Sequence, residues 1–278
     1  MAVTISTHNG SRVAREHNIR NPKIVSKEGH IKPNGICEIW HDEKPRQAYE
    51  RIFSQSVAEY NAKQMREDRK IKDYYNQICK DKKKNPVYEM IISIGSSTGE
   101  RVPDEVGKEI MKKFVDTWKE RNPNLELIGA YYHADEMGVP HVHCSYIGWS
   151  SGFKKGMSIQ SSISKAYESM GFTKQGKETG QILWQRRENA YLEQLCNERG
   201  IEVVHPQIEG RKHLETKDFK LQATIEERKK EVLKLNEEID ELTECYNDTL
   251  DELSSVKSLQ NIIKIQEEME LDEDDLER

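Results

Sequence analysis

The feature that most constrains the fold is a pair of apolar segments joined by a short polar connection. Residues 125–133 (LELIGAYYH) and 140–149 (PHVHCSYIGW) are rich in the aliphatic and aromatic residues that favour β-strands. The intervening ADEMGV contains Gly138 and is short enough to close a hairpin. The sequence therefore predicts an antiparallel hairpin over residues 125–149.

Other segments carry the same kinds of signal. Strand-like patterns occur at residues 2–7 (AVTIST), 36–41 (ICEIWH) and 87–95 (VYEMIISIG). Helical spacing of apolar residues predicts one long helix from Pro45 to about Ile78 and further helices over residues 103–121, 157–170 and 181–200. We therefore expect helices and strands to be mixed in one domain.

The formal charge of −6 is divided unevenly along the chain. Residues 1–210 hold 32 basic and 28 acidic residues, whereas residues 211–278 hold 11 and 21, so the front carries +4 and the tail −10. A mildly basic front permits DNA binding without requiring it. The five cysteines show no C-x-x-C spacing, and no apolar run suits a membrane span or a signal peptide, so we expect a cytoplasmic protein.

A heptad pattern begins at Leu221 and continues for about six repeats. One core position holds Ile225, Val232, Ile239, Tyr246 and Leu253, and the other holds Leu221, Leu235, Leu242, Val256 and Ile263. We predict a globular domain over residues 1–215 and an acidic coiled-coil tail over 216–278. A helix that packs on the domain, or one that only aids solubility, is the alternative.

Three histidines and two carboxylates fall within residues 133–143, HADEMGVPHVH. Side chains alternate across a strand, so His141 and His143 should project from one face while Val142 projects from the other. A hairpin would bring His133 back beside that pair. The three imidazoles could bind one metal ion and leave positions open for substrate, as in a catalytic site. Ordinary histidines on a hairpin and a structural zinc site are the alternatives.

Such an ion would polarise a phosphoryl oxygen, which suits phosphodiester transfer. The segment R-E-H-N-I-R offers a nucleophile in His17, because a neutral imidazole can attack phosphorus and form a phosphoramidate. Arg20 could brace the phosphate with its fork of donors. Alone, H-x-x-R is a weak motif that more often marks a surface pair.

The segment HADEMGVPHVH resembles the H-x-D-E-x-x-x-P-H-x-H signature of the plasmid mobilisation and recombination proteins, the Mob/Pre or MobV-type relaxases of the HUH endonuclease superfamily. The segments HNIR, SKEGHIKPNG, YNAKQMREDRKIKDYY and NPVYEMIISIG are similar as well, so the resemblance covers about residues 1–215. It implies an α+β, relaxase-like fold in which helices pack on an antiparallel sheet. The heptad pattern adds a long C-terminal coiled-coil helix.

The resemblance implies a relaxase that nicks single-stranded or hairpin DNA at a plasmid or integrative-element transfer origin and stays covalently attached to it. His17 falls on the family's nucleophile. His133, His141 and His143 fall on its metal ligands, with manganese or magnesium as the expected ion. The tail would serve self-association or contact with the transfer machinery.

Two acidic residues and several basic ones complete the implied site. Glu136 falls on the acidic residue beside the metal, as a fourth ligand or as an acid, and Asp135 is expected to orient an imidazole. The residues that we expect to contact DNA are His30, Arg66, Arg69, Lys70, Lys154 and Lys155.

Two departures from the family pattern concern the active site. The connection between the strands carries one residue more than the commonest pattern, which affects the position of Glu136. GHIKPN has no tyrosine after His30, which favours His17 as nucleophile, with Tyr74 or Tyr75 as the tyrosine alternative. The competing interpretations are a rolling-circle replication initiator with a tyrosine nucleophile and a non-catalytic DNA-binding or coiled-coil scaffold protein.

Overall fold

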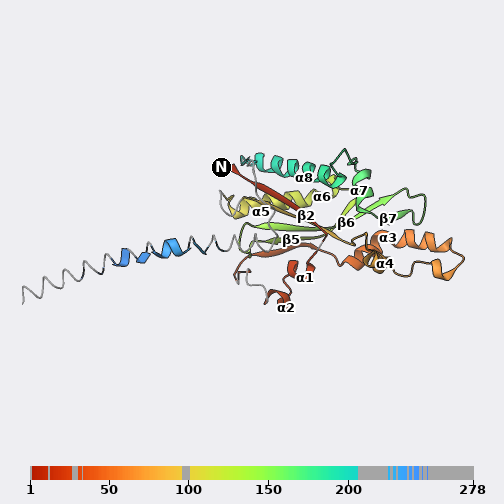
Figure 1. Ribbon diagram of the computed structural model, residues 1–278, viewed down its shortest axis with the longest axis horizontal. Coiled ribbons are helices and arrows are strands. Elements are labelled where there is room, and N and C mark those ends of the chain that lie inside the picture. Colours follow the sequence, from red (N-terminus) through yellow and green to blue (C-terminus); the bar gives the residue numbers. More distant parts are fainter. Residues whose placement is uncertain are drawn as a thin grey trace, which may run out of the picture. The chain divides into compact units, whose positions relative to one another are not determined.

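The computed structural model describes residues 2–11, 13–26, 31–32, 34–95 and 101–205, and beyond them short stretches between residues 225 and 249 (Figure 1). The chain divides into two compact units, Met1–Arg211 and Lys212–Arg278, and each is described by itself. Among the described helices, none combines the length and the apolar character that a membrane span requires.

A six-stranded antiparallel sheet runs through the first unit. Its strands, in spatial order, are β2 (Ile5–Gly10), β4 (Tyr88–Ile94), β6 (His141–Ser151), β5 (Leu125–His133) and β3 (Cys37–Asp42), with β7 (Ile159–Ser161) also paired to β6. The predicted hairpin is confirmed as β5 and β6, and the α+β fold with an antiparallel sheet is confirmed as well. A separate parallel pair joins β1 (Ala2–Val3) to β8 (Glu202–Val203).

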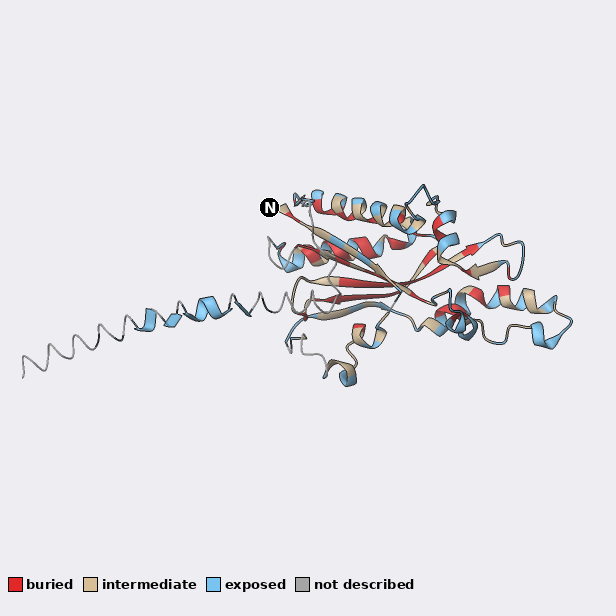
Figure 2. Cartoon of the chain, in the orientation of Figure 1, coloured by how far each residue is buried: buried red, intermediate tan, exposed pale blue. Residues whose placement is uncertain are grey.

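Four of the described helices cover one face of the sheet (Figure 1). They are α5 (Asp104–Asp116), α6 (Trp118–Arg121), α7 (Ile163–Ser169) and α8 (Gly180–Asn197). Alternate residues of β6, Val142, Cys144 and Tyr146, point into this layer and are buried against Trp118 and Trp184. Figure 2 shows buried residues along the strands and on the inner sides of these helices.

The opposite face of the sheet is covered by two separate groups of helices. At one end, α3 (Pro45–Ala62) and α4 (Tyr74–Lys80) form a second core, in which Phe53 packs with Ile128 and Ile147. Toward the other end lie the short helices α1 (Arg15–Asn18) and α2 (Pro22–Val25) (Figure 1). At the β5–β6 turn, the helix that lies over this face of the sheet is therefore α1.

The single helix predicted from Pro45 to Ile78 is wrong. The chain leaves α3 after Ala62 and turns back, because the Asn61 side chain both accepts from the Ile71 backbone N–H (2.8 Å) and donates to the Ile71 carbonyl oxygen (2.9 Å). A short 3₁₀ turn, Glu67–Arg69, lies between. Helix α4 then starts afresh, with the Asp73 carboxylate accepting from the Asn76 N–H.

Two other predicted helices differ in extent. The helix expected over 103–121 is interrupted at Thr117, whose hydroxyl donates to the Lys113 carbonyl oxygen (2.8 Å). The helix expected over 157–170 begins only at Ile163, because Ile159–Ser161 pair with β6 and Ser162 caps the helix. The helix predicted over 181–200 is confirmed as α8.

The described residues of the second unit are all helical. Those that occupy heptad core positions are exposed, and they are Ile225, Val232, Leu235, Ile239, Leu242 and Tyr246. Leu221, Leu253, Val256 and Ile263 lie outside the described residues. The coiled coil therefore stays a prediction.

Candidate metal centre and active site

The β5–β6 hairpin places three histidines beside one another. His133 pairs directly with His141, and His143 lies two residues further along β6. Val142 is fully buried under the helices, so His141 and His143 project from the opposite face, as strand alternation predicts. The ring centroid of His133 lies 5.5 Å from that of His141 and 4.9 Å from that of His143.

Each of these histidines has one ring nitrogen bonded to a pure acceptor. The pairs are His133 Nε2 with the Asn18 carbonyl oxygen (3.0 Å), His141 Nδ1 with the Val139 carbonyl oxygen (3.1 Å) and His143 Nδ1 with the Glu89 carboxylate (3.0 Å). Because these oxygens accept hydrogen bonds, the three nitrogens donate. In the neutral rings the lone pairs then sit on His133 Nδ1, His141 Nε2 and His143 Nε2.

The atoms that carry these lone pairs suit a metal ion. His141 Nε2 lies 3.1 Å from His143 Nε2, a contact between lone pairs that a cation or a shared proton would stabilise. Among the described residues, His133 Nδ1 is buried without a hydrogen-bond partner, 3.3 Å from Glu136 Oε1. Neighbouring ligand atoms about 2.1 Å from a shared ion are about 3.0–3.4 Å apart. The residues present therefore fit a divalent cation.

Helix α1 adds a fourth imidazole to this group. His17 Nε2 lies 2.9 Å from Glu136 Oε1, and its ring centroid lies 5.6 Å from that of His133. The group whose potential ligand atoms all lie within 4.8 Å of one another consists of His17, His133, Glu136 and His143. His141 joins through its contact with His143 and lies 3.8 Å from Glu136 Oε1. The residue expected to be the nucleophile therefore lies beside the residues expected to bind the metal.

Arg20 ties the β5–β6 connection to α1. Its Nε and Nη2 donate to the two carboxylate oxygens of Asp135 (2.7 and 2.6 Å), and Nη2 also donates to Glu136 Oε1 (3.0 Å). Its Nη1 donates to the His17 carbonyl oxygen (3.0 Å). The φ of Arg20 is 55°, a left-handed conformation that costs a residue with a side chain about 1–2 kcal/mol and is held by these contacts. We expected Asp135 to orient an imidazole, and its carboxylate instead binds this guanidinium.

The charges of the site suit metal binding. Burial would raise the pKa of Glu136, yet its contacts with His133 and His17 in their protonated forms hold that pKa well below its usual value. When those rings are neutral, the Arg20 guanidinium, 3.0 Å from Glu136 Oε1, still favours the ionised carboxylate. Burial, with the charge of His143, lowers the pKa of His141 to about 4, and burial also lowers the pKa of His133. Near neutral pH the carboxylate is therefore ionised and these two imidazoles are neutral, the forms in which each binds a metal.

A loop segment fixes the backbone of the two acidic residues. The Lys32 N–H donates to the Asp135 carbonyl oxygen (2.6 Å), and Ile31 forms a β-bridge with Glu136. Gly35 approaches so closely that a Cβ there would lie 2.2 Å from Asp135 Cα. Only glycine fits at this point without displacing Asp135.

Comparison with known proteins identifies the chain's relatives. Residues 40–221 match the family described as a plasmid recombination enzyme (Mob_Pre), which is more than half of the chain. The protein belongs to the Mob/Pre family. No curated protein matches the chain. The part matched to the Mob/Pre family contains the three hairpin histidines but begins after His17 and Arg20, which the fold brings to them.

Two solved structures are similar to this Mob/Pre protein. One is the MobM relaxase domain bound to 22-nucleotide oriT DNA of plasmid pMV158 with manganese at pH 5.5, at 17% identity and a TM-score of 0.44, covering 79% of this chain and 99% of that one. The other is the same domain with a 3′-thiophosphate on the DNA and manganese at pH 6.8, at 18% identity and a TM-score of 0.43, covering 79% and 98%.

The two candidate tyrosine nucleophiles lie in the second core of this Mob/Pre protein. Tyr74 and Tyr75 pack against Tyr49, and the Tyr74 hydroxyl accepts from the Ser161 backbone N–H (2.9 Å). Burial raises the pKa of both phenols. Their surroundings are those of packing residues.

Five of the predicted DNA-binding residues lie on connections between the longer helices and strands. Arg66, Arg69 and Lys70 belong to the α3–α4 connection, where Arg66 pairs with Asp68 (2.7 Å) and Lys70 pairs with Glu67. Lys154 and Lys155 lie exposed on the β6–β7 connection. His30 lies outside the described residues.

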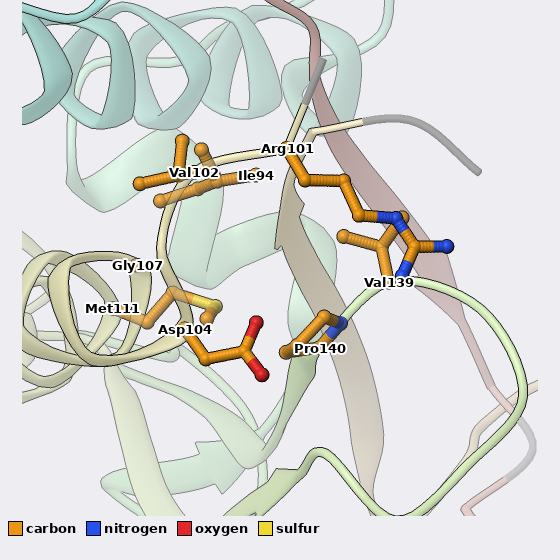
Figure 3. Close-up of a pocket in the computed structure, with 8 residues that line it drawn as sticks. All are labelled: Ile94, Arg101, Val102, Asp104, Gly107, Met111, Val139 and Pro140. Carbon is orange, nitrogen blue, oxygen red and sulfur yellow. The ribbon is translucent and has the colours of Figure 1, made fainter. Parts of the chain in front are cut away.

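A small cavity lies next to the β5–β6 connection (Figure 3). It is lined by Ile94, Arg101, Val102, Asp104, Gly107, Met111, Val139 and Pro140, and its volume is about 10 Å³. That volume admits about one water molecule, which excludes a nucleotide.

Two residues at the site were absent from the sequence-based set. Glu89 is the charged residue of the otherwise largely apolar strand β4, and that contrast was the available signal. Asn18 follows His17 in the H-N-x-R segment, and only its position beside the nucleophile could have drawn attention. Both are buried and bonded to the histidine ligands.

Proposed function

We propose that this Mob/Pre protein is a site-specific relaxase. Its domain, residues 1–215, would nick one strand of a plasmid or integrative-element transfer origin and remain covalently attached to the 5′ end. The observation that carries this proposal is the convergence of His17 from α1 with His133, Glu136 and His143 in one group. His133, His141, His143 and Glu136 could already supply four ligands, which would leave the imidazole of His17 available for chemistry beside the ion.

The residues that would hold the ion are His133, His141 and His143 with Glu136. A set of imidazole nitrogens and a carboxylate suits a divalent ion such as Mn²⁺ or Mg²⁺, and manganese is the ion in the MobM relaxase domains. When bound, the ion would polarise the scissile phosphate and stabilise the charge that develops on its oxygens.

His17 would supply the nucleophile. A ring nitrogen forms a bond to phosphorus while the bond from phosphorus to the 3′ oxygen breaks, and the 3′ oxygen leaves and takes up a proton. Glu136, 2.9 Å from His17 Nε2, would stabilise the positive charge that develops on the ring. Arg20 would hold Glu136 and His17 in place and add positive charge beside the phosphate.

The test uses the full chain and single-stranded DNA that carries the inverted repeat flanking its gene. We expect Mn²⁺ to be required both for cleavage and for a covalent protein–DNA adduct. His143→Ala should abolish cleavage, and His17→Ala should abolish the adduct while retaining Mn²⁺ binding. Full adduct formation by His17→Ala would exclude His17 as the nucleophile.

The basic loops would bind the origin DNA through its phosphates. Arg66, Arg69, Lys70, Lys154 and Lys155, together with His30, form the proposed set. Replacing a phosphate-contacting lysine or arginine should reduce the slope of log affinity against log salt by about one. Fluorescence anisotropy over a salt series would measure it, and an unchanged slope would remove that residue from the interface.

The tail would mediate self-association, or contact with transfer machinery. The described heptad positions, including Val232 and Ile239, are exposed, and burying such a stripe against a second copy is the usual outcome of a heptad repeat. Sedimentation of the full chain and of residues 1–215 should give different oligomeric states. Identical states would leave contact with other proteins as the role of the tail.

A further inference from the structure

Glu89 is a buried carboxylate directly behind the metal site. Its exposed fraction is 5%, and it sits on β4 opposite Ser145 of β6. Its Oε2 accepts from His143 Nδ1 (3.0 Å), and its Oε1 accepts from Asn18 Nδ2 (2.7 Å) and, more weakly, from the Ser145 hydroxyl (3.4 Å). A buried carboxylate is stable only with such partners, so the position is specific for an acceptor of several hydrogen bonds.

Glu89 contacts the His143 ring at Nδ1, on the side opposite the nitrogen that would bind the ion. The Nδ1 atom of His143 is occupied by Glu89, which leaves Nε2 to face His141 Nε2. The group of potential ligands, accordingly, includes His143 but not Glu89. A carboxylate that fixes the tautomer and orientation of a ligand imidazole increases metal affinity.

Asn18 extends this contact to the helix that carries the nucleophile. It is fully buried, it follows His17 directly in α1, and its side chain donates to Glu89. Its backbone carbonyl oxygen accepts from His133 Nε2 (3.0 Å). Asn18, next to His17 in the chain, therefore contacts both His133 and the carboxylate of Glu89 that holds His143.

We propose that Glu89 and Asn18 are positioning residues that hold His143 and His133 as ligands and dock α1 so that His17 faces the same ion. The two have separable effects. Glu89 acts on metal affinity through His143, and the Asn18 side chain acts on the placement of His17 through α1. This proposal rests on the relaxase function proposed above.

The variants are Glu89→Ala, Glu89→Gln and Asn18→Ala, with Glu38→Ala as control. Glu38 is also a carboxylate on a strand of the sheet, but it pairs with Lys108 of α5 on the other face. Mn²⁺ affinity is measured by calorimetry on metal-free protein without DNA. The rate of adduct formation is measured separately at saturating Mn²⁺.

Glu89→Ala should weaken Mn²⁺ binding about 10–100-fold. Glu89→Gln should restore most of that affinity, because the Gln oxygen still accepts from His143 and its amide can donate to Asn18 Oδ1, which is buried without a partner among the described residues. Asn18→Ala keeps the carbonyl that holds His133, so it should bind Mn²⁺ about as the wild type does. Its rate at saturating Mn²⁺ should fall about 10–100-fold because His17 is displaced.

Wild-type affinity in Glu89→Ala would overturn the role of Glu89. A loss in Asn18→Ala that is entirely in affinity, and recovers at saturating Mn²⁺, would overturn the role of Asn18. If Glu89→Ala does not fold, Glu89→Gln provides the test. A loss of Mn²⁺ affinity in Glu89→Gln as large as the loss in His143→Ala would show that the hydrogen bond to His143 is not what positions this ligand. Failure of the relaxase function would show as a wild type that binds Mn²⁺ but forms no adduct, and the affinity series would still test Glu89.

Discussion

Replacing Arg20 by alanine should destabilise the metal-free protein strongly. The Arg20, Asp135 and Glu136 side chains are 13%, 6% and 7% exposed, so the variant removes the guanidinium from two buried carboxylates, of which Glu136 keeps its contact with His17. Breaking a buried ion pair by removing one partner costs about 3–5 kcal/mol. Urea unfolding in the presence of EDTA, followed by circular dichroism, measures this difference in the free energy of unfolding.

The matched control is Arg15→Ala. Arg15 also forms a two-pronged pair with an aspartate, Asp42, but the two side chains are 22% and 25% exposed. A pair in contact with water contributes about 0–1 kcal/mol. Arg20→Gly removes the same contacts as Arg20→Ala but suits the φ of 55°, so it should be no less stable than Arg20→Ala. An equal loss in Arg15→Ala and Arg20→Ala, or a loss below about 1 kcal/mol in Arg20→Ala, would refute the argument from burial.

Three further outcomes can be measured on the same protein. In Gly35→Ala the added Cβ would lie 2.2 Å from Asp135 Cα, so urea unfolding should show a loss of about 1–3 kcal/mol. In Gly107→Ala, inside α5, the added Cβ would meet no atom outside its own helix within 4 Å, so the control should lose no stability or gain about 0.5–1 kcal/mol, and equal losses would contradict this. Mn²⁺ at 100 times its Kd should raise the free energy of unfolding by about 2.7 kcal/mol, and a similar gain in His143→Ala would argue against this site. The pKa of His141 is lowered from 6.5 to about 4, so the unfolded chain binds this proton more readily than the metal-free folded protein does. The free energy of unfolding should therefore be fully present above pH 6.5 and should fall as the pH drops toward 4. His141→Gln should flatten this decline, and an unchanged dependence of the free energy of unfolding on pH would contradict the role of His141.

Local patterns in the sequence predicted the part of the site that lies on one hairpin. Strand alternation requires only that β6 be a strand, and it put His141 and His143 on one face. The turn at Gly138 then returned His133 to them. Each of these steps involves residues close in sequence, so periodicity was sufficient.

The rest of the site depends on contacts that periodicity does not encode. His17 meets Glu136 across 119 residues of sequence, and Asn18 meets Glu89 across 71. The docking of α1, a four-residue helix with no apolar stripe of its own, results from these polar contacts. The broken helix after Ala62 has a similar cause, since the two hydrogen bonds from Asn61 to Ile71 override a helical pattern that continues in the sequence.

The residue that carries the DNA in the covalent adduct shows whether His17 or a tyrosine is the nucleophile. Trypsin cleavage after Arg15 and Arg20 releases the peptide EHNIR, which holds His17 and no tyrosine, while Tyr74 and Tyr75 fall in DYYNQICK. After nuclease and trypsin treatment at alkaline pH, mass spectrometry should find the nucleotide on EHNIR, and brief acid treatment should remove it because a phosphoramidate is acid-labile. An acid-stable nucleotide on DYYNQICK would show that a tyrosine, and not His17, attacks the DNA.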